Sequence, residues 1–203
     1  MAAITMVGLQ EVVWRVVPLE TPAVLRHCTK CRKLSRFVCS ETFRLNAQQR
    51  KVDVWLVYRC AICETTWNCT IFSRCVPEEI DAELYQRLQN NDQDAAWRYA
   101  FDLSLLERAG GQVDAHVPVQ VQHFPKSSMD GASSGLRIYV ELPYPCKVRL
   151  DRLLVEELRV SRSCVEQWFA RGVLQVLSEE KHVLRRPVRH GQVMLLLDGL
   201  LRR

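Results

Sequence analysis

The sequence has 203 residues, enough for one large domain or two small ones, and 48% of them are hydrophobic, which excludes a wholly disordered chain. It has no apolar run of about 18 residues, as a membrane span needs, and Met1–Leu9 lacks the basic start of a secretory signal. We therefore expect a cytoplasmic protein with no membrane partner.

The net charge of +5 lies entirely in the last third of the chain. Residues 1–136 hold 15 basic and 15 acidic side chains, whereas residues 137–203 hold 13 basic and 8 acidic ones. A local excess of positive charge favours an anionic partner such as nucleic acid. An ordinary solvated surface is the alternative interpretation.

Residues 1–77 are predicted to form a β-rich domain. Glu11–Pro18 carries two runs of valine around Trp14, and Val52–Tyr58 is dense in β-branched and aromatic residues, as a buried strand is. Trp67–Phe72 is a further candidate strand.

Residues 78–110 are predicted to be helical. Asp81 is a candidate N-cap, and Asn90–Asp92 marks a break before a second helix. Large apolar side chains then recur every four residues up to a glycine pair, which predicts one helix face that packs into the core. The recurring side chains are Trp97, Phe101 and Leu105.

Residues 111–136 contain HFPKSSMDGASSG, whose serine, glycine and proline content predicts a linker or loop. The main domain boundary is therefore expected here. Leu136–Leu142 alternates apolar and polar residues, as a half-buried strand does. It opens a C-terminal module over residues 137–203.

Four of the nine cysteines form two Cys-x-x-Cys pairs, Cys28/Cys31 and Cys60/Cys63. An odd cysteine count without an export signal makes a disulfide framework the poorer interpretation, whereas paired cysteines in a reducing compartment more often hold metal. Two thiolates separated by two residues can both turn inward on one tight turn. Two such turns supply the four corners of a tetrahedral zinc site.

This cysteine pattern resembles a zinc ribbon. Four thiolates close the coordination shell, so we expect a structural Zn²⁺ ion without a catalytic water. Redox-active or merely buried cysteines are the alternatives. One of Cys39, Cys69 or Cys75 could also replace an expected ligand.

A first C-terminal helix is predicted from Arg149 to Arg159. Leucines recur on one face and arginines lie roughly opposite, so the leucines pack and the arginines face outward. A second helix is predicted to begin at Ser161 or Ser163, since Ser163 fits a capping box. Its core side chains are expected to be Val165 and Phe169. Two predicted strands follow, Val173–Leu177 and Gln192–Leu197.

Four segments of this region occur in a recognisable order, namely Arg149-Leu150-Asp151, Val160-Ser161-Arg162-Ser163, Arg171-Gly172-Val173 and Arg185-Arg186-Pro187. In this order they resemble the alpha-L RNA-binding domain first described in small-subunit ribosomal protein S-four. That family usually has Asn-Gly where this chain has Ser178–Lys181, and the acidic pair within this segment would repel phosphate.

The resemblance implies that the two helices present basic and hydroxyl side chains to structured RNA, either ribosomal RNA or tRNA, or to the ribosome. The implied contacts are Arg149, Arg152, Ser161, Arg162 and Arg171 on the helices, with Lys181, Arg185 and Arg186 from the hairpins. Arginine suits this role because it makes bidentate contacts to phosphate and can hold A-form RNA without reading its bases.

A second resemblance covers the whole chain. The segments Asn46-Ala47-Gln48 and Asp53–Asn68 resemble an uncharacterised bacterial family, a domain of unknown function with an N-terminal zinc ribbon and a C-terminal S-four-type domain. It implies no activity. The fold class expected is α+β, with a β-rich zinc ribbon, a central helical segment and a C-terminal alpha-L module.

Three functions follow as hypotheses. The first is a non-enzymatic, zinc-containing RNA-binding protein. The second, an RNA-modifying enzyme, is disfavoured because the sequence has no glycine-rich phosphate loop, no deaminase signature and no clear nucleophile–base pair. The third is an adaptor that docks a protein partner through the zinc ribbon or the helices of residues 78–110. Substituting the arginines of residues 149–171 would then leave partner binding intact.

Overall fold

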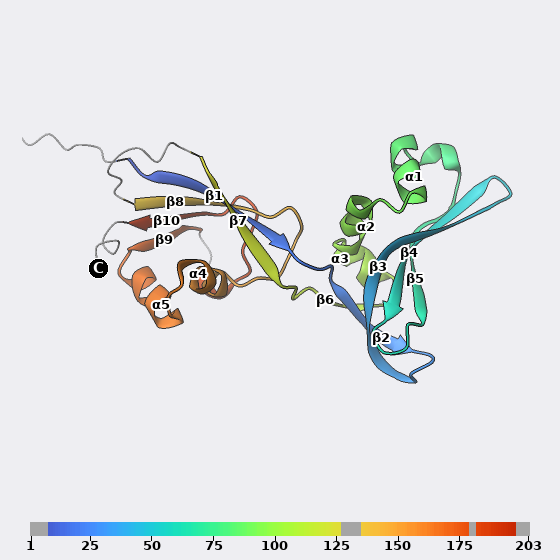
Figure 1. Cartoon of the computed structure of the whole chain (residues 1–203), viewed down its shortest axis with the longest axis horizontal. Coiled ribbons are helices and arrows are strands. Elements are labelled where there is room, and N and C mark those ends of the chain that lie inside the picture. The colour runs from blue at the N-terminus through green and yellow to red at the C-terminus, as the bar shows by residue number, and fades with distance from the viewer. Residues whose placement is uncertain (1–7, 127–134, 179–181, 198–203) are drawn as a thin grey trace, which may run out of the picture. The chain divides into compact units, whose positions relative to one another are not determined.

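A computed structural model describes residues 8–126, 135–178 and 182–197 of the chain, which divides into two compact units (Figure 1). Unit 2 spans Glu20–Val117, and unit 1 takes in the chain up to Leu19 and from Pro118 onward. Each unit combines one sheet with helices, so the α+β class is confirmed. No helix in the described ranges is long and apolar enough to cross a membrane.

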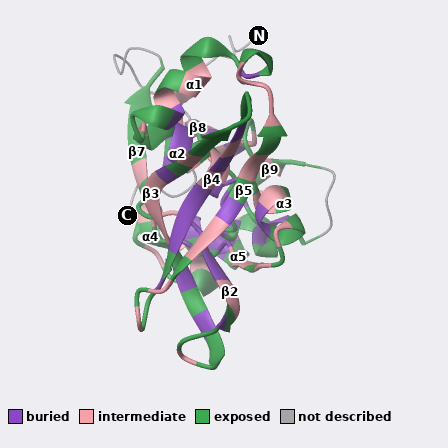
Figure 2. Ribbon diagram, turned by 90° about the vertical axis from the view of Figure 1, so that its right-hand side faces the viewer, coloured by how far each residue is buried: buried purple, intermediate pink, exposed green. Residues whose placement is uncertain are grey.

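Unit 2 contains an antiparallel sheet in the strand order β5-β4-β3-β2-β6. Its strands are β2 (Ala23–Cys28), β3 (Lys33–Gln48), β4 (Lys51–Cys60), β5 (Thr66–Cys75) and β6 (Gln112–Asp114). The interior strand β4, between β5 and β3, holds the β-branched run predicted to be buried, and Figure 2 shows it as a band of buried residues. The core therefore lies along the middle of this sheet.

Short helices lie in sequence between β5 and β6 of unit 2: η1 (Pro77–Glu79), α1 (Ala82–Gln89), α2 (Gln93–Ala100) and α3 (Leu103–Arg108). The prediction of a single helix through Trp97 and Leu105 is wrong. The helix that contains Trp97, α2, ends at Ala100, and α3 begins after Asp102. The carboxylate of Asp102 accepts the backbone N–H of Leu105 at 2.9 Å and so caps α3.

Unit 1 contains a mixed sheet in the strand order β7-β1-β8-β10-β9. Its strands are β1 (Gln10–Pro18), β7 (Val119–Pro125), β8 (Gly135–Glu141), β9 (Leu174–Leu177) and β10 (Val193–Leu197). β1 runs parallel to β8, and the other neighbouring pairs are antiparallel. Two helices, α4 (Leu150–Leu158) and α5 (Arg162–Ala170), and the short 3-10 helix η2 (Val183–Arg185) complete the unit.

The unit boundaries differ from the expected division at residues 77, 110 and 136. Strand β1 belongs with the C-terminal part of the chain because it hydrogen-bonds to β7 and β8, more than 100 residues away. The expected linker 111–136 also contains β6 and β7, which pair in different sheets. Residues 127–134 of that segment lie outside the described ranges.

The helix boundaries of unit 1 follow the predicted ones closely. Arg159 ends α4 in a left-handed conformation with φ 53°, and Ser161, rather than Ser163, caps α5 by accepting the N–H of Cys164 at 3.2 Å. Val165 is fully buried as expected. Phe169 is 40% exposed instead of forming core, because it lies in the last turn of α5, where it lines a surface pocket.

Candidate metal centre and arginine cluster

The two cysteine pairs lie in two turns of the same local fold. The first turn joins β2 to β3 and the second joins β4 to β5. In each turn, the residue four positions after the first cysteine is left-handed, Arg32 with φ 54° and Glu64 with φ 62°. The N–H groups of these residues donate to the carbonyls of Cys28 and Cys60 at 2.8 and 2.9 Å. The repeated geometry turns both side chains of each pair inward.

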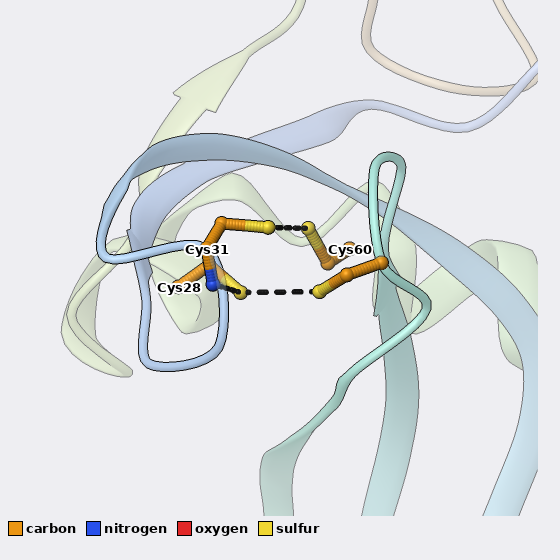
Figure 3. A group of neighbouring side chains, drawn as sticks. Cys28, Cys31 and Cys60 are labelled. Carbon is orange, nitrogen blue, oxygen red and sulfur yellow. Dashed lines mark hydrogen bonds between the residues drawn. The ribbon is translucent and has the colours of Figure 1, made fainter.

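The four sulfur atoms converge between these turns. Figure 3 shows the turns facing each other, with the sulfurs of Cys31 and Cys60 directed toward one another. The Sγ atoms of Cys31 and Cys60 are 3.9 Å apart, and those of Cys28 and Cys63 are 3.5 Å apart. All four lie within 4.8 Å of one another. Sulfurs about 2.3 Å from a tetrahedral metal would be roughly 3.8 Å apart, so the cluster is compatible with a structural metal ion.

The electrostatics of this cluster favour a bound cation. The hydrogen bond with the side chain of Thr65 lowers the pKa of Cys63 to about 6. A hydrogen bond to Cys63 raises the pKa of Cys31 to about 12, because Cys31 keeps its proton beside a neighbouring thiolate. Cys31 therefore tends to stay protonated unless positive charge lies beside the sulfurs. A divalent cation would displace that proton.

The other candidate ligands lie outside the cluster. Cys39 and Cys69 sit farther along the sheet, and burial raises their pKa values to about 12 and 11. The histidine next to the first pair, His27, is also outside the cluster, because it is exposed and, as the neighbour of Cys28 in β2, its side chain points to the other face of the sheet. The metal ligands predicted from the spacing alone are thus the ones that the structure brings together.

A second cluster forms where α4 and α5 begin. Arg149 precedes α4 and Arg162 opens α5, and both contact the carboxylate of Asp151. The Oδ2 atom of Asp151 lies 2.7 Å from a terminal guanidinium nitrogen of each arginine. Its Oδ1 atom accepts the Arg149 Nε–H at 3.1 Å and the backbone N–H of Arg152 at 2.9 Å. We call Arg149, Arg152 and Arg162 the arginine cluster.

Asp151 is buried while the arginines around it remain accessible. Its side chain is 4% exposed, whereas those of Arg149 and Arg162 are 45% and 52% exposed. The three arginines line a surface cavity of about 280 Å³ with Asp151 and Val155. Arg152 and Arg162 also meet glutamates one helical turn on, Glu156 and Glu166, at 2.8 and 3.8 Å. The cavity therefore presents three guanidinium groups, and the Asp151 carboxylate holds two of them, those of Arg149 and Arg162.

The remaining RNA-contact candidates are spread more widely. Ser161 is exposed beside Arg162, and the backbone carbonyl of Arg186 accepts the N–H of Leu150, next to Arg149. Arg171 caps the far end of α5, and Arg185 lines the separate pocket beside Phe169. Lys181 lies outside the described residues. The structure thus brings together about half of the predicted set.

Asp151 has a role that was not predicted from the sequence, namely that of the shared acceptor of Arg149 and Arg162. The signal was present, because Asp151 falls one turn before Leu154 on the border of the apolar face of α4. A carboxylate there is drawn into the core and must find cationic partners. Only the fold shows that one partner comes from the next helix.

A comparison with family models gives a match over residues 45–180 to a family described as a protein of unknown function (DUF1062). The matched span covers more than half of the 203 residues. The chain belongs to this family. The DUF1062 match includes Cys60, Cys63 and both helices of the arginine cluster, whereas Cys28 and Cys31 precede it. No curated protein and no solved structure matches the chain significantly.

Proposed function

We propose that this DUF1062 protein is a non-enzymatic, zinc-containing RNA-binding protein that contacts structured RNA through its C-terminal S-four-type module. The observation that carries the proposal is the arginine cluster, in which two guanidinium groups from different helices meet one buried carboxylate and stay half exposed. Their fixed orientation lowers the entropy lost when they bind phosphate. The excess positive charge of residues 137–203 supports the same partner.

The proposed metal is zinc in a zinc ribbon. Sulfur ligands from two tight turns at tetrahedral spacing suit zinc, and four thiolates leave no open coordination position for chemistry. The ion would hold the turns β2–β3 and β4–β5 together and so stabilise unit 2. Exposed Lys30, Arg32 and Lys33 around the first turn would offset the negative charge of a four-thiolate site.

The test is binding of the purified full chain to ribosomal RNA and to tRNA across a salt series. Tight binding with a steep salt dependence is expected, because phosphate contacts release counterions. Arg149→Gln/Arg162→Gln should weaken binding to all structured RNAs and reduce the salt slope by about one per lost contact. Arg44→Gln, an exposed arginine of β3 in unit 2, is the matched control. Equal binding by both variants would refute the proposal.

A protein-interaction adaptor is the second candidate, favoured by apolar side chains at the metal end of unit 2. Leu34 and Ile62 are 62% and 60% exposed, and each lies within three residues of a cysteine ligand. Exposed apolar groups beside basic ones fit a protein surface. If this function holds, a partner captured by the full chain should be lost with Leu34→Ser/Ile62→Ser and retained with the arginine substitutions.

A further inference from the structure

The sheet of unit 1 has two faces of different character. Trp14 lies on one of them, stacked on His123 at 5.4 Å, and His123 in turn hydrogen-bonds Glu157 of α4 at 2.7 Å. This face therefore looks toward the helices. Because successive side chains of a strand alternate, the neighbours of Trp14 and His123 point to the opposite side. We call this opposite side the outer face.

One apolar or aromatic side chain from each strand forms a row across the outer face. The strand register aligns them in the order Phe124 (β7), Val13 (β1), Tyr139 (β8), Val193 (β10) and Leu177 (β9). None of the five is buried, and Phe124 and Leu177 are 42% and 59% exposed. A solvated sheet face usually carries polar residues, so this row indicates a binding surface.

Each of the two aromatic rings of the row makes a cation–π contact with a basic side chain. The Arg15 guanidinium carbon lies 4.8 Å from the centroid of the Phe124 ring, and the Lys126 ammonium lies 4.0 Å from that of Tyr139. The Tyr139 hydroxyl also donates to Glu11 at 2.9 Å, which fixes the ring within the face. The rings are thus preorganised at low further cost in side-chain entropy.

We propose that the outer face binds single-stranded RNA, with bases stacked on Phe124 and Tyr139 and phosphates near the cations. Base stacking needs an exposed ring or guanidinium plane, and the Arg15–Phe124 stack offers both. A base can also replace the Lys126 ammonium on Tyr139, which frees that ammonium for a phosphate. This inference deepens the proposed RNA-binding function but uses residues on the opposite side of the sheet from α4.

The charges of the outer face favour RNA over a protein partner. The row is flanked by charged side chains, among them Arg15 paired with Glu141 at 3.0 Å and Arg137 paired with Glu11 at 3.1 Å. A protein interface would bury these groups in its centre, where charged residues are depleted because desolvation is costly. A nucleic acid strand leaves them hydrated. Three basic side chains, Arg15, Arg137 and Lys126, stand against the two carboxylates of Glu11 and Glu141.

The experiment uses a single-stranded RNA octamer that carries 2-aminopurine, whose fluorescence falls when it stacks on a ring. The full chain should quench it with a salt-dependent affinity. Tyr139→Leu and Phe124→Leu keep apolar area but remove the ring, and each should weaken binding about fivefold or more. Tyr139→Phe keeps the ring and should retain most of the affinity. Thermal unfolding of each variant checks that the fold is intact.

Two controls separate the possible outcomes. Leu177→Ser removes an apolar group without a ring from the same row, and it should bind the octamer like the natural chain. If this variant loses as much affinity as the ring variants, or if the leucine variants bind normally, the stacking proposal is wrong.

The failure of this inference is distinguishable from failure of the proposed function. Arg149→Gln/Arg162→Gln should reduce binding to structured RNA while leaving the octamer affinity within about twofold. Octamer binding without structured-RNA binding would support the outer face and refute the arginine cluster. The reverse result would refute the outer face alone.

Discussion

Arg162 at the start of α5 donates to Asp151 in the first turn of α4, with its terminal nitrogen 2.7 Å from Oδ2. The contact joins the two helices through a carboxylate whose side chain is only 4% exposed. It fixes the angle at which both helices present their arginines. The ion pair therefore neutralises a buried carboxylate and also positions the arginine side chains at the surface.

Replacing Asp151 with Asn should destabilise unit 1 and disperse the arginine cluster. The variant leaves two guanidinium groups without their shared acceptor, which should lower the free energy of unfolding by about 1–3 kcal/mol. Urea denaturation measures this loss. Structured-RNA affinity should fall as well, although the substitution removes a negative charge. Stronger RNA binding by Asp151→Asn would mean that the carboxylate only neutralises the arginines.

Loss of one metal ligand should unfold unit 2. The binding free energy of a structural zinc site is about 10 kcal/mol or more, and it counts toward folding. Cys28→Ser and Cys60→Ser should each lower the metal content from one ion per chain to near zero and abolish the cooperative unfolding of the unit. Elemental analysis and calorimetry measure these effects. Cys75→Ser, in β5 outside the cluster, should retain the ion.

Glu41 should stabilise the packing of α2 on the sheet. It sits at the register shift of β3 in a left-handed conformation, and its carboxylate accepts the Trp97 indole N–H at 2.7 Å and the Gln93 amide N–H at 2.8 Å. Glu41→Ala should cost about 1–3 kcal/mol of unfolding free energy, measured by urea denaturation. Glu107→Ala, on the exposed surface of α3, should change it by under about 0.5 kcal/mol.

The acid stability of unit 2 should depend on Asp92. The hydrogen bond from Arg87 and the N–H of Ala95 hold the pKa of Asp92 below its ordinary value. A lowered pKa means that the charged form stabilises the fold above the unfolded pKa of about 3.9, and that this contribution is lost as pH falls through the folded pKa. The difference in unfolding free energy between the natural chain and Asp92→Asn should therefore shrink between about pH 5 and pH 2. A difference independent of pH would contradict this linkage.

The sequence predicts local features of this fold better than long-range ones. The Cys-x-x-Cys spacing identified all four metal-ligand candidates, because each pair needs only one tight turn. Ser161 and Ser163 were both predicted as possible caps of α5 for the same local reason, and Ser161 is the one that accepts the N–H of Cys164. The assignment of β1 to unit 1 was not predictable, since its partners follow more than 100 residues later. Asp102 also breaks an apolar repeat that looks continuous, because its side chain competes for the backbone N–H of Leu105.

In the chain, unit 2 is inserted between β1 and β7 of unit 1, two strands that are hydrogen-bonded to each other. Pro18 of β1 pairs with Val119 of β7, and the N–H of Leu19 donates to the carbonyl of Pro118 at 2.9 Å. These two contacts continue the β1–β7 pairing up to the residues at which unit 2 begins and ends. Topologically, unit 2, which carries the cysteine cluster, is an insertion between the two strands of a β-hairpin. A short reverse turn from residue 19 to residue 118 would complete that hairpin, so the five-stranded sheet and the RNA surfaces proposed on it can be produced as a shortened chain and studied without the cysteine cluster.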